Sequence, residues 1–135
     1  MIISNFNLSS HITEVMPKKI ILIEDDPSNL DALTLALTCN QYQVFGFLNG
    51  GQMMESIRSI VPDMIIIDIM LGYEDGRALC SVIRETPDIS HLPVILIPAD
   101  GDISVIRDCQ ADAFIKKPFD INEMYQLIES HMLIM

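Results

Sequence analysis

The sequence repeatedly places a short apolar run directly before charged residues, and this arrangement limits the folds open to the chain. Three runs show it: 20–23 before Glu24 and Asp25, 64–67 before Asp68, and 114–116 before Lys117. If each run is a buried strand of one parallel sheet, the charged ends share the edge where open α/β sheets build their sites. We therefore expect carboxylates and one lysine to converge there.

From residue 19 onward, apolar runs alternate with segments of helical period, which is typical of βαβ units. The pattern predicts an α/β fold in which a doubly wound, five-stranded parallel sheet carries helices on both faces. Residues 1–16 have no sustained period, so we predict a leader there, before one domain at 17–135. The predicted strands are 19–24, 43–47, 64–68, 94–97 and 113–116, and the predicted helices are 27–39, 53–60, about 76–85, 103–109 and 120–132.

The charge of the chain narrows the classes of partner. Nineteen acidic and eight basic side chains give a formal net charge of −11. Sequence-independent binding to nucleic acid needs clustered Lys and Arg, so we predict no nucleic-acid partner. No apolar run reaches the roughly 18 residues of a membrane span, and the N-terminus lacks a basic-then-apolar signal pattern. We predict a cytoplasmic protein without a membrane partner.

The carboxylates at the two strand ends indicate a site for a divalent cation. Mg²⁺ prefers oxygen ligands and keeps several waters, so one or two carboxylates and a phosphoryl oxygen would complete its coordination. We select Asp25 and Asp68 as ligands, with Glu24 acting directly or through water. A carboxylate beside a metal can also attack phosphorus to form an aspartyl phosphate, and Asp68 is the candidate nucleophile. Lys117 would supply a fixed positive charge to the phosphoryl oxygens.

In their order and spacing, these motifs resemble the receiver domain of two-component response regulators over about residues 18–131. The matching segments are 19–27 (KIILIEDDP), 62–71 (PDMIIIDIML) followed by Asp75-Gly76, and 111–119 (ADAFIKKPF). The resemblance implies a flavodoxin-like sheet with strand order 2-1-3-4-5. It also implies that Asp68 is the phosphoacceptor, that Glu24 and Asp25 form an acidic pair, and that Lys117 contacts phosphate.

Further roles come with the resemblance alone. The Met70 backbone carbonyl would be another Mg²⁺ ligand, Phe114 occupies the position of the aromatic switch, and the Lys117–Pro118 bond is often cis in this family. Such domains are not enzymes beyond their own Mg²⁺-dependent phosphorylation and dephosphorylation. Their partners are a histidine kinase or histidine phosphotransfer protein and a downstream protein target. We expect a monomer or a weak homodimer.

One position departs from the family pattern. Receivers usually end the fourth strand with a Thr or Ser whose hydroxyl moves onto the phosphoryl group, whereas this chain has Pro98. Proline offers neither a side-chain donor nor a backbone N–H, and its ring fixes φ. The Ala99 N–H could still bind a phosphoryl oxygen. The segment from Pro98 to Phe114 is also about three residues shorter than usual, or roughly one helical turn.

Two functions therefore stay open. The first is a stand-alone receiver that takes a phosphoryl group on Asp68 and signals through a protein interface or passes the group on. The second is a receiver-like docking module that needs no phosphorylation, which Pro98 favours. A phosphohydrolase of the haloacid-dehalogenase type is set aside, because the position two residues after Asp68 is Met70 rather than a second aspartate.

Overall fold

A five-stranded parallel sheet forms the centre of the molecule in a computed structural model, which describes residues 16–98 and 109–132. The elements are β2 (Lys19–Ile23), α2 (Pro27–Cys39), β3 (Gln43–Phe47), α3 (Met53–Ile60), β4 (Met64–Asp68), β5 (Met70–Leu71), β6 (Glu74–Asp75), α4 (Gly76–Arg84), β7 (Val94–Ile97), β8 (Ala113–Phe114) and α5 (Ile121–His131). The strand order is β3-β2-β4-β7-β8, and every neighbouring pair is parallel. This is the predicted 2-1-3-4-5 order.

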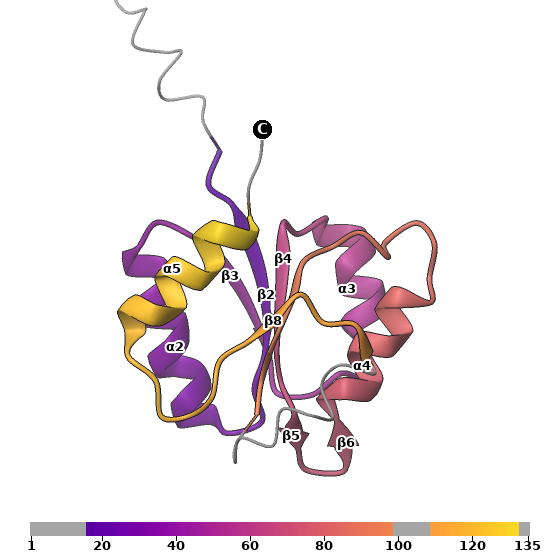
Figure 1. Cartoon of the computed structure of the whole chain (residues 1–135), viewed down its shortest axis with the longest axis horizontal. Helices are drawn as coiled ribbons and strands as arrows, with labels where there is room; N and C mark the ends of the chain where they lie inside the picture. Colours follow the sequence, from indigo (N-terminus) through magenta and orange to yellow (C-terminus); the bar gives the residue numbers. More distant parts are fainter. Residues whose placement is uncertain (1–15, 99–108, 133–135) are drawn as a thin grey trace, which may run out of the picture.

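The sheet separates two helical layers and two cores. Helices α2 and α5 cover one face of the sheet, and α3 and α4 cover the other (Figure 1). Successive strand residues point to opposite faces, so Ile21 and Ile23 of β2 pack in the core beneath α3 and α4. Ile20 and Leu22 pack in the core beneath α2 and α5. All four side chains are fully buried, as expected for a strand covered on both sides.

Side-chain caps fix where the helices begin. The Asp26 carboxylate accepts a hydrogen bond from the Ser28 N–H at the start of α2, and Pro27 occupies the first turn. A capping box is present at the start of α5: Asp120 accepts from helix N–H groups, and the Glu123 side chain accepts from the Asp120 N–H at 3.1 Å. These caps place the loop from β2 to α2 and the loop before α5 at the carboxyl edge of the sheet.

Two predicted elements differ from the structure. The last strand was expected at 113–116, but β8 spans two residues. One reason is that Pro98 ends β7 and has no N–H to donate to the neighbouring strand. The predicted strand at 64–68 and the predicted helix at about 76–85 leave a loop between them, whereas β5 and β6 form a small antiparallel hairpin there, with a turn that begins at Gly72, φ 70°. Three predictions fall on residues outside those described. They are the leader apart from Met16, Ala99, and the helix at 103–109 apart from Cys109.

Candidate functional site at the carboxyl edge of the sheet

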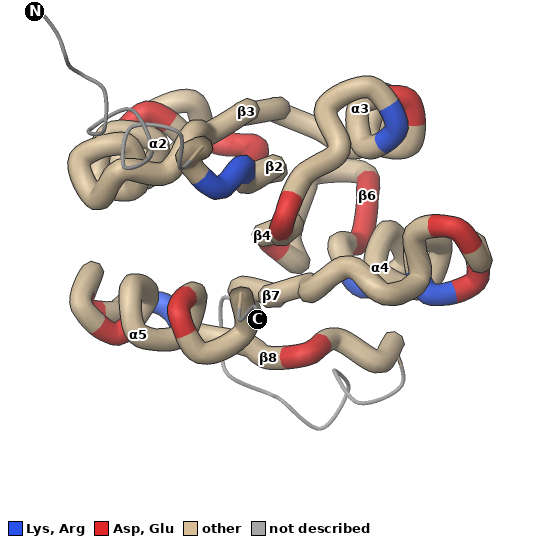
Figure 2. Tube along the Cα trace, turned by 90° about the horizontal axis from the view of Figure 1, so that it is seen from above, with Lys and Arg blue, Asp and Glu red and all other residues tan. Residues whose placement is uncertain are grey.

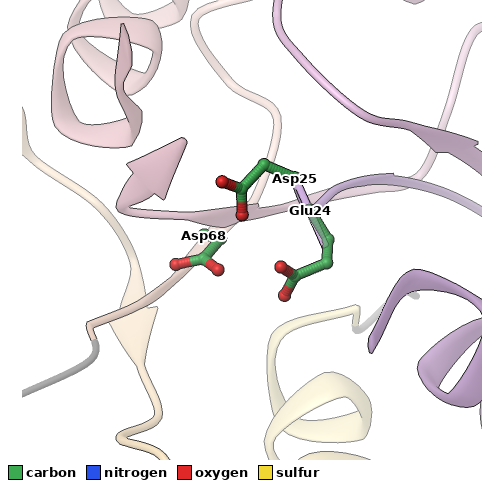
Figure 3. A group of neighbouring side chains, drawn as sticks. All are labelled: Glu24, Asp25 and Asp68. Atoms are coloured by element: carbon green, nitrogen blue, oxygen red, sulfur yellow. The ribbon is translucent and has the colours of Figure 1, made fainter. Parts of the chain in front are cut away.

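The strand register brings the predicted carboxylates together. Strands β2 and β4 are neighbours, and Ile23 lies opposite Ile67, so the residue after Ile23 lies beside the residue after Ile67. These residues are Glu24 and Asp68. Figure 3 shows the side chains of Glu24, Asp25 and Asp68 converging from the ends of the two strands. One carboxylate oxygen from each of the three lies within 4.8 Å of the others.

The three carboxylates differ in their exposure to solvent. Glu24 is 1% exposed and Asp68 is 2% exposed, whereas Asp25 is exposed. The two buried acids therefore line the floor of the site, and Asp25 stands at its entrance. Burial of a carboxylate is costly unless its charge is paired and hydrogen-bonded. The contacts of Glu24 and Asp68 meet that requirement in part.

Lys117, which lies after β8, contacts both buried acids. Its Nζ lies 3.1 Å from Asp68 Oδ2 and 3.3 Å from Glu24 Oε1. The backbone before it is held by the neighbouring strand, because the Ile115 N–H donates to the Leu96 carbonyl at 3.0 Å. The Lys117–Pro118 peptide bond is cis, as the resemblance implied.

Backbone N–H groups bind the remaining oxygens of the buried acids. The Met70 N–H donates to Asp68 Oδ1 at 3.1 Å, and the Asp26 N–H donates to Glu24 Oε2 at 3.2 Å. Each carboxylate therefore has one oxygen toward Lys117 and one toward the backbone that follows its strand. These contacts hold both carboxylate groups in fixed orientations.

The protonation of Glu24 and Lys117 reflects this environment. Burial raises the pKa of Glu24 most strongly, and the Asp68 charge adds to the rise, while the Asp26 N–H and Lys117 oppose it. Burial by itself would lower the pKa of Lys117. The hydrogen bonds and charges of Asp68 and Glu24 outweigh that effect, so the pKa of Lys117 lies above its usual value. The lysine is thus held as a cation.

The site has the composition that a divalent cation needs. Three carboxylates and one ammonium group leave an excess of two negative charges at this edge when all four are ionised. Carboxylate oxygens are ligands that Mg²⁺ prefers, and crowded like charges destabilise the site unless a cation joins them. The residues therefore fit a small divalent cation in charge and in donor type.

The other residues selected from the sequence lie around this cluster. Pro98 is buried where β7 ends, and its carbonyl accepts from the Lys117 N–H at 3.4 Å. Met70 lies two residues after Asp68 and is 61% exposed. Phe114, on β8, is 37% exposed, so it is not the core residue that its position in a strand would favour.

Two residues that pack against the site were not selected from the sequence. A Cβ atom on Gly76 would lie 2.3 Å from the carbonyl oxygen of Asp68, so α4 starts in direct contact with the end of β4. The Glu74 carboxylate accepts from the Gly50 N–H at 2.8 Å and ties the hairpin to the loop after β3. The Asp75-Gly76 dipeptide of the motif was a signal for the first contact. No local pattern indicates the second.

Comparisons with known proteins agree with this geometry. The family model described as "Response regulator receiver domain" matches residues 20–129. The chain is 27% identical over 120 residues to the polar-differentiation response regulator DivK of Brucella anthropi, covering 87% of this chain and 98% of DivK. It is 35% identical over 115 residues to the sensory transduction protein BceR of Halalkalibacterium halodurans, covering 83% of this chain and 48% of BceR.

Solved structures give the same result. The BeF3-activated N-terminal receiver domain of RstA from Klebsiella pneumoniae superposes with a TM-score of 0.79 at 25% identity, covering 87% of this chain and all of that one. A signal receiver domain of a histidine kinase from Syntrophus aciditrophicus gives 0.73 at 30% identity, covering 85% and 89%. The chain spans nearly all of DivK but about half of BceR. The fold, the acidic edge and the family match together show that this chain belongs to the response regulator receiver domains of two-component signal transduction.

Proposed function

We propose that the chain receives a phosphoryl group on Asp68 and signals through its phosphorylated form. The observation that carries the proposal is the placement of Asp68. Its carboxylate is buried at the sheet edge within 3.1 Å of the Lys117 ammonium and beside two further carboxylates. An oxygen of Asp68 would attack the phosphorus atom of the donor as the bond from phosphorus to the donor's leaving group breaks. The product is an aspartyl phosphate.

The other residues of the site would stabilise the charge of the phosphoryl group. Lys117 is already within reach of Asp68 Oδ2 and would move its ammonium onto a phosphoryl oxygen. Glu24, Asp25 and the Met70 carbonyl would hold Mg²⁺ together with Asp68. Bound Mg²⁺ would neutralise negative charge on the phosphoryl oxygens. The Ala99 N–H is proposed as a further donor, although this residue lies outside those described.

The partners that we propose are proteins. A histidine kinase or histidine phosphotransfer protein would donate the phosphoryl group, and a downstream protein would bind the phosphorylated chain. The match to DivK, which covers 98% of that response regulator, supports signalling through a separate protein partner. Lys and Arg residues do not gather on one face of the described part of the fold, and Asp and Glu residues are spread over several of its helices and strands (Figure 2). That distribution supports our proposal that nucleic acid is not a partner. We further propose a cytoplasmic monomer or weak dimer.

No helix in the described part of the chain has the length and apolar character to cross a membrane.

Pro98 supports a second candidate function, a docking module that works without phosphorylation. Pro98 is buried at the end of β7, beside the strand that carries Asp68. It cannot supply the hydroxyl that receivers usually draw onto the phosphoryl group, and its fixed φ resists movement of the chain there. In this alternative, the acidic site holds a cation and shapes a surface, and partner binding does not change with phosphorylation.

Intact-mass measurement after incubation with Mg²⁺ and acetyl phosphate separates the two functions. The matched control is Asp68→Asn, which keeps the size of the side chain and removes the nucleophile. We expect a phosphoryl adduct on the native chain and none on the variant, with unchanged circular dichroism. An equal adduct on both proteins would refute the assignment of Asp68. An adduct on neither, with Mg²⁺ binding intact, would favour the docking module.

A further inference from the structure

The hairpin formed by β5 and β6 carries part of the proposed cation site but has little structure of its own. Each strand contributes two residues, and the pairs are Met70 with Asp75 and Leu71 with Glu74. A two-stranded hairpin is marginally stable by itself. The Met70 N–H also binds Asp68, so the position of the hairpin affects the nucleophile directly. Some outside contact must therefore fix the hairpin.

Glu74 supplies such a contact. Its Oε1 accepts a hydrogen bond from the backbone N–H of Gly50, in the loop between β3 and α3, at 2.8 Å. This bond joins the hairpin to a loop 24 residues earlier in the chain. Hydrogen bonds to an ionised carboxylate are shorter and stronger than neutral ones. A Cβ atom on Gly50 would lie 2.7 Å from the end of the Leu79 side chain and 3.2 Å from Glu74 Oε2, so a larger residue there would require these side chains to shift.

Glu74 also shares a cleft with the cation site. A cleft of about 390 Å³ is lined by Asp25, Met70, Glu74 and Arg77, among others. The guanidinium group of Arg77 is held by Asp75, with its Nε 2.9 Å from Asp75 Oδ1. Asp25 is the exposed member of the acidic cluster. The carboxylate of Glu74 therefore lies on the wall of the same cleft as a proposed ligand.

We propose that Glu74 is a positioning residue for the cation site, acting through the Gly50 N–H. Its bond to Gly50 holds the hairpin so that the Met70 backbone stays beside Asp68. The proposal rests on the proposed function, because it concerns the Mg²⁺ site of that function. Groups that orient metal ligands without touching the metal typically change metal affinity by 10–100-fold when removed. A backbone-positioning contact should fall at the lower end, about tenfold.

Three variants of the full chain test the proposal. Glu74→Ala removes both the hydrogen bond and the charge, whereas Glu74→Gln keeps an oxygen that can accept from the Gly50 N–H. Glu85→Ala removes an exposed carboxylate at the end of α4 and is the matched control. Two quantities are measured for each: the Mg²⁺ dissociation constant by calorimetry, and the exchange rate of the Gly50 amide proton by NMR in metal-free protein. Urea midpoints check that each variant is folded.

We expect Glu74→Ala to raise the Mg²⁺ dissociation constant about tenfold and to speed exchange at Gly50. Glu74→Gln should keep most of the protection at Gly50 and lose less affinity, and Glu85→Ala should match the native chain. If the Ala and Gln variants lose affinity equally, or if Gly50 exchange is unchanged in Glu74→Ala, the positioning role is wrong. If the native chain accepts a phosphoryl group on Asp68 but Glu74→Ala binds Mg²⁺ normally, the inference fails and the proposed function stands. Native protein that binds no Mg²⁺ and forms no adduct would refute both.

Discussion

Replacement of Gly76 by Ala should damage the proposed phosphoacceptor site through a contact that involves no functional group. A Cβ atom at this position would lie 2.3 Å from the Asp68 carbonyl oxygen and 2.9 Å from its carbonyl carbon. Non-bonded heavy atoms prefer separations of roughly 3.5 Å, so the start of α4 and the end of β4 would have to move apart by about 1 Å.

Neither element can yield easily. Strand β4 is buried along its whole length, and the first turn of α4 is held by the Asp75 cap and by the Gly76 N–H, which donates to the Ile69 carbonyl at 2.8 Å. Overpacking of this kind costs about 1–3 kcal/mol, and the anchors on both sides favour the upper end. The better helix propensity of Ala returns at most about 1 kcal/mol. We therefore expect Gly76→Ala to lower the free energy of unfolding by about 2 kcal/mol.

Phosphorylation should suffer more than stability does. A displacement of about 1 Å at a reacting group can slow a reaction about 100-fold. The assay is urea unfolding at constant m value, together with the rate of adduct formation from acetyl phosphate. Gly51→Ala is the control, because among the described residues a Cβ atom there meets only the Asn49 side chain, at 3.0 Å. If Gly76→Ala matches Gly51→Ala in both measurements, the proposed contact does not constrain Asp68.

Three further changes have defined outcomes. Val61 is 69% exposed and has φ 55°, a left-handed conformation that costs about 1–2 kcal/mol. Val61→Asn should therefore raise the free energy of unfolding, and with it the urea midpoint; an unchanged midpoint would exclude strain there. The raised pKa of Glu24 means that the folded state holds its proton more tightly, so stability falls as pH rises from the unfolded value near 4.5 through the folded pKa. Glu24→Gln should remove this fall in metal-free protein and weaken Mg²⁺ binding; a fall of the same size in the variant would exclude Glu24 as its source. Pro98→Thr should strengthen the effect of phosphorylation on partner affinity, and an equal effect in both proteins would show that Pro98 does not limit switching.

Local patterns predict the central strands of this fold well, because those strands are covered on both faces. The apolar runs that form β2, β4 and β7 are fully buried along their lengths, apart from the partly exposed Lys19 at the start of β2. The edge strand β8 was predicted too long, because Pro98, which follows the neighbouring strand β7, has no N–H to extend the pairing. This effect of Pro98 cannot be read from residues 113–116 themselves.

The candidate site shows the same division between local and non-local information. Convergence of Glu24, Asp68 and Lys117 follows from parallel strands that end in charged residues, so the sequence could predict it. The bond between Glu74 and Gly50 could not be predicted, since it joins a hairpin strand to a loop and no motif connects the two. The contact of Gly76 with Asp68 could be predicted in part. The Asp75-Gly76 dipeptide marks the position, but the structure is needed to show that α4 starts too close to the end of β4 for a Cβ atom.

The chemistry of the site opposes the stability of the metal-free fold. Glu24 and Asp68 follow the apolar, buried residues 20–23 and 64–67, and Lys117 is the cation within reach of both among the described residues. The raised pKa of Glu24 shows that its charge is incompletely compensated there. A bound divalent cation would remove that deficit, and any ligand that binds the folded state alone stabilises it. Substitutions that neutralise Glu24 should therefore stabilise the metal-free protein and reduce the stabilisation that Mg²⁺ provides. The two effects have opposite signs because they arise from the same uncompensated charge.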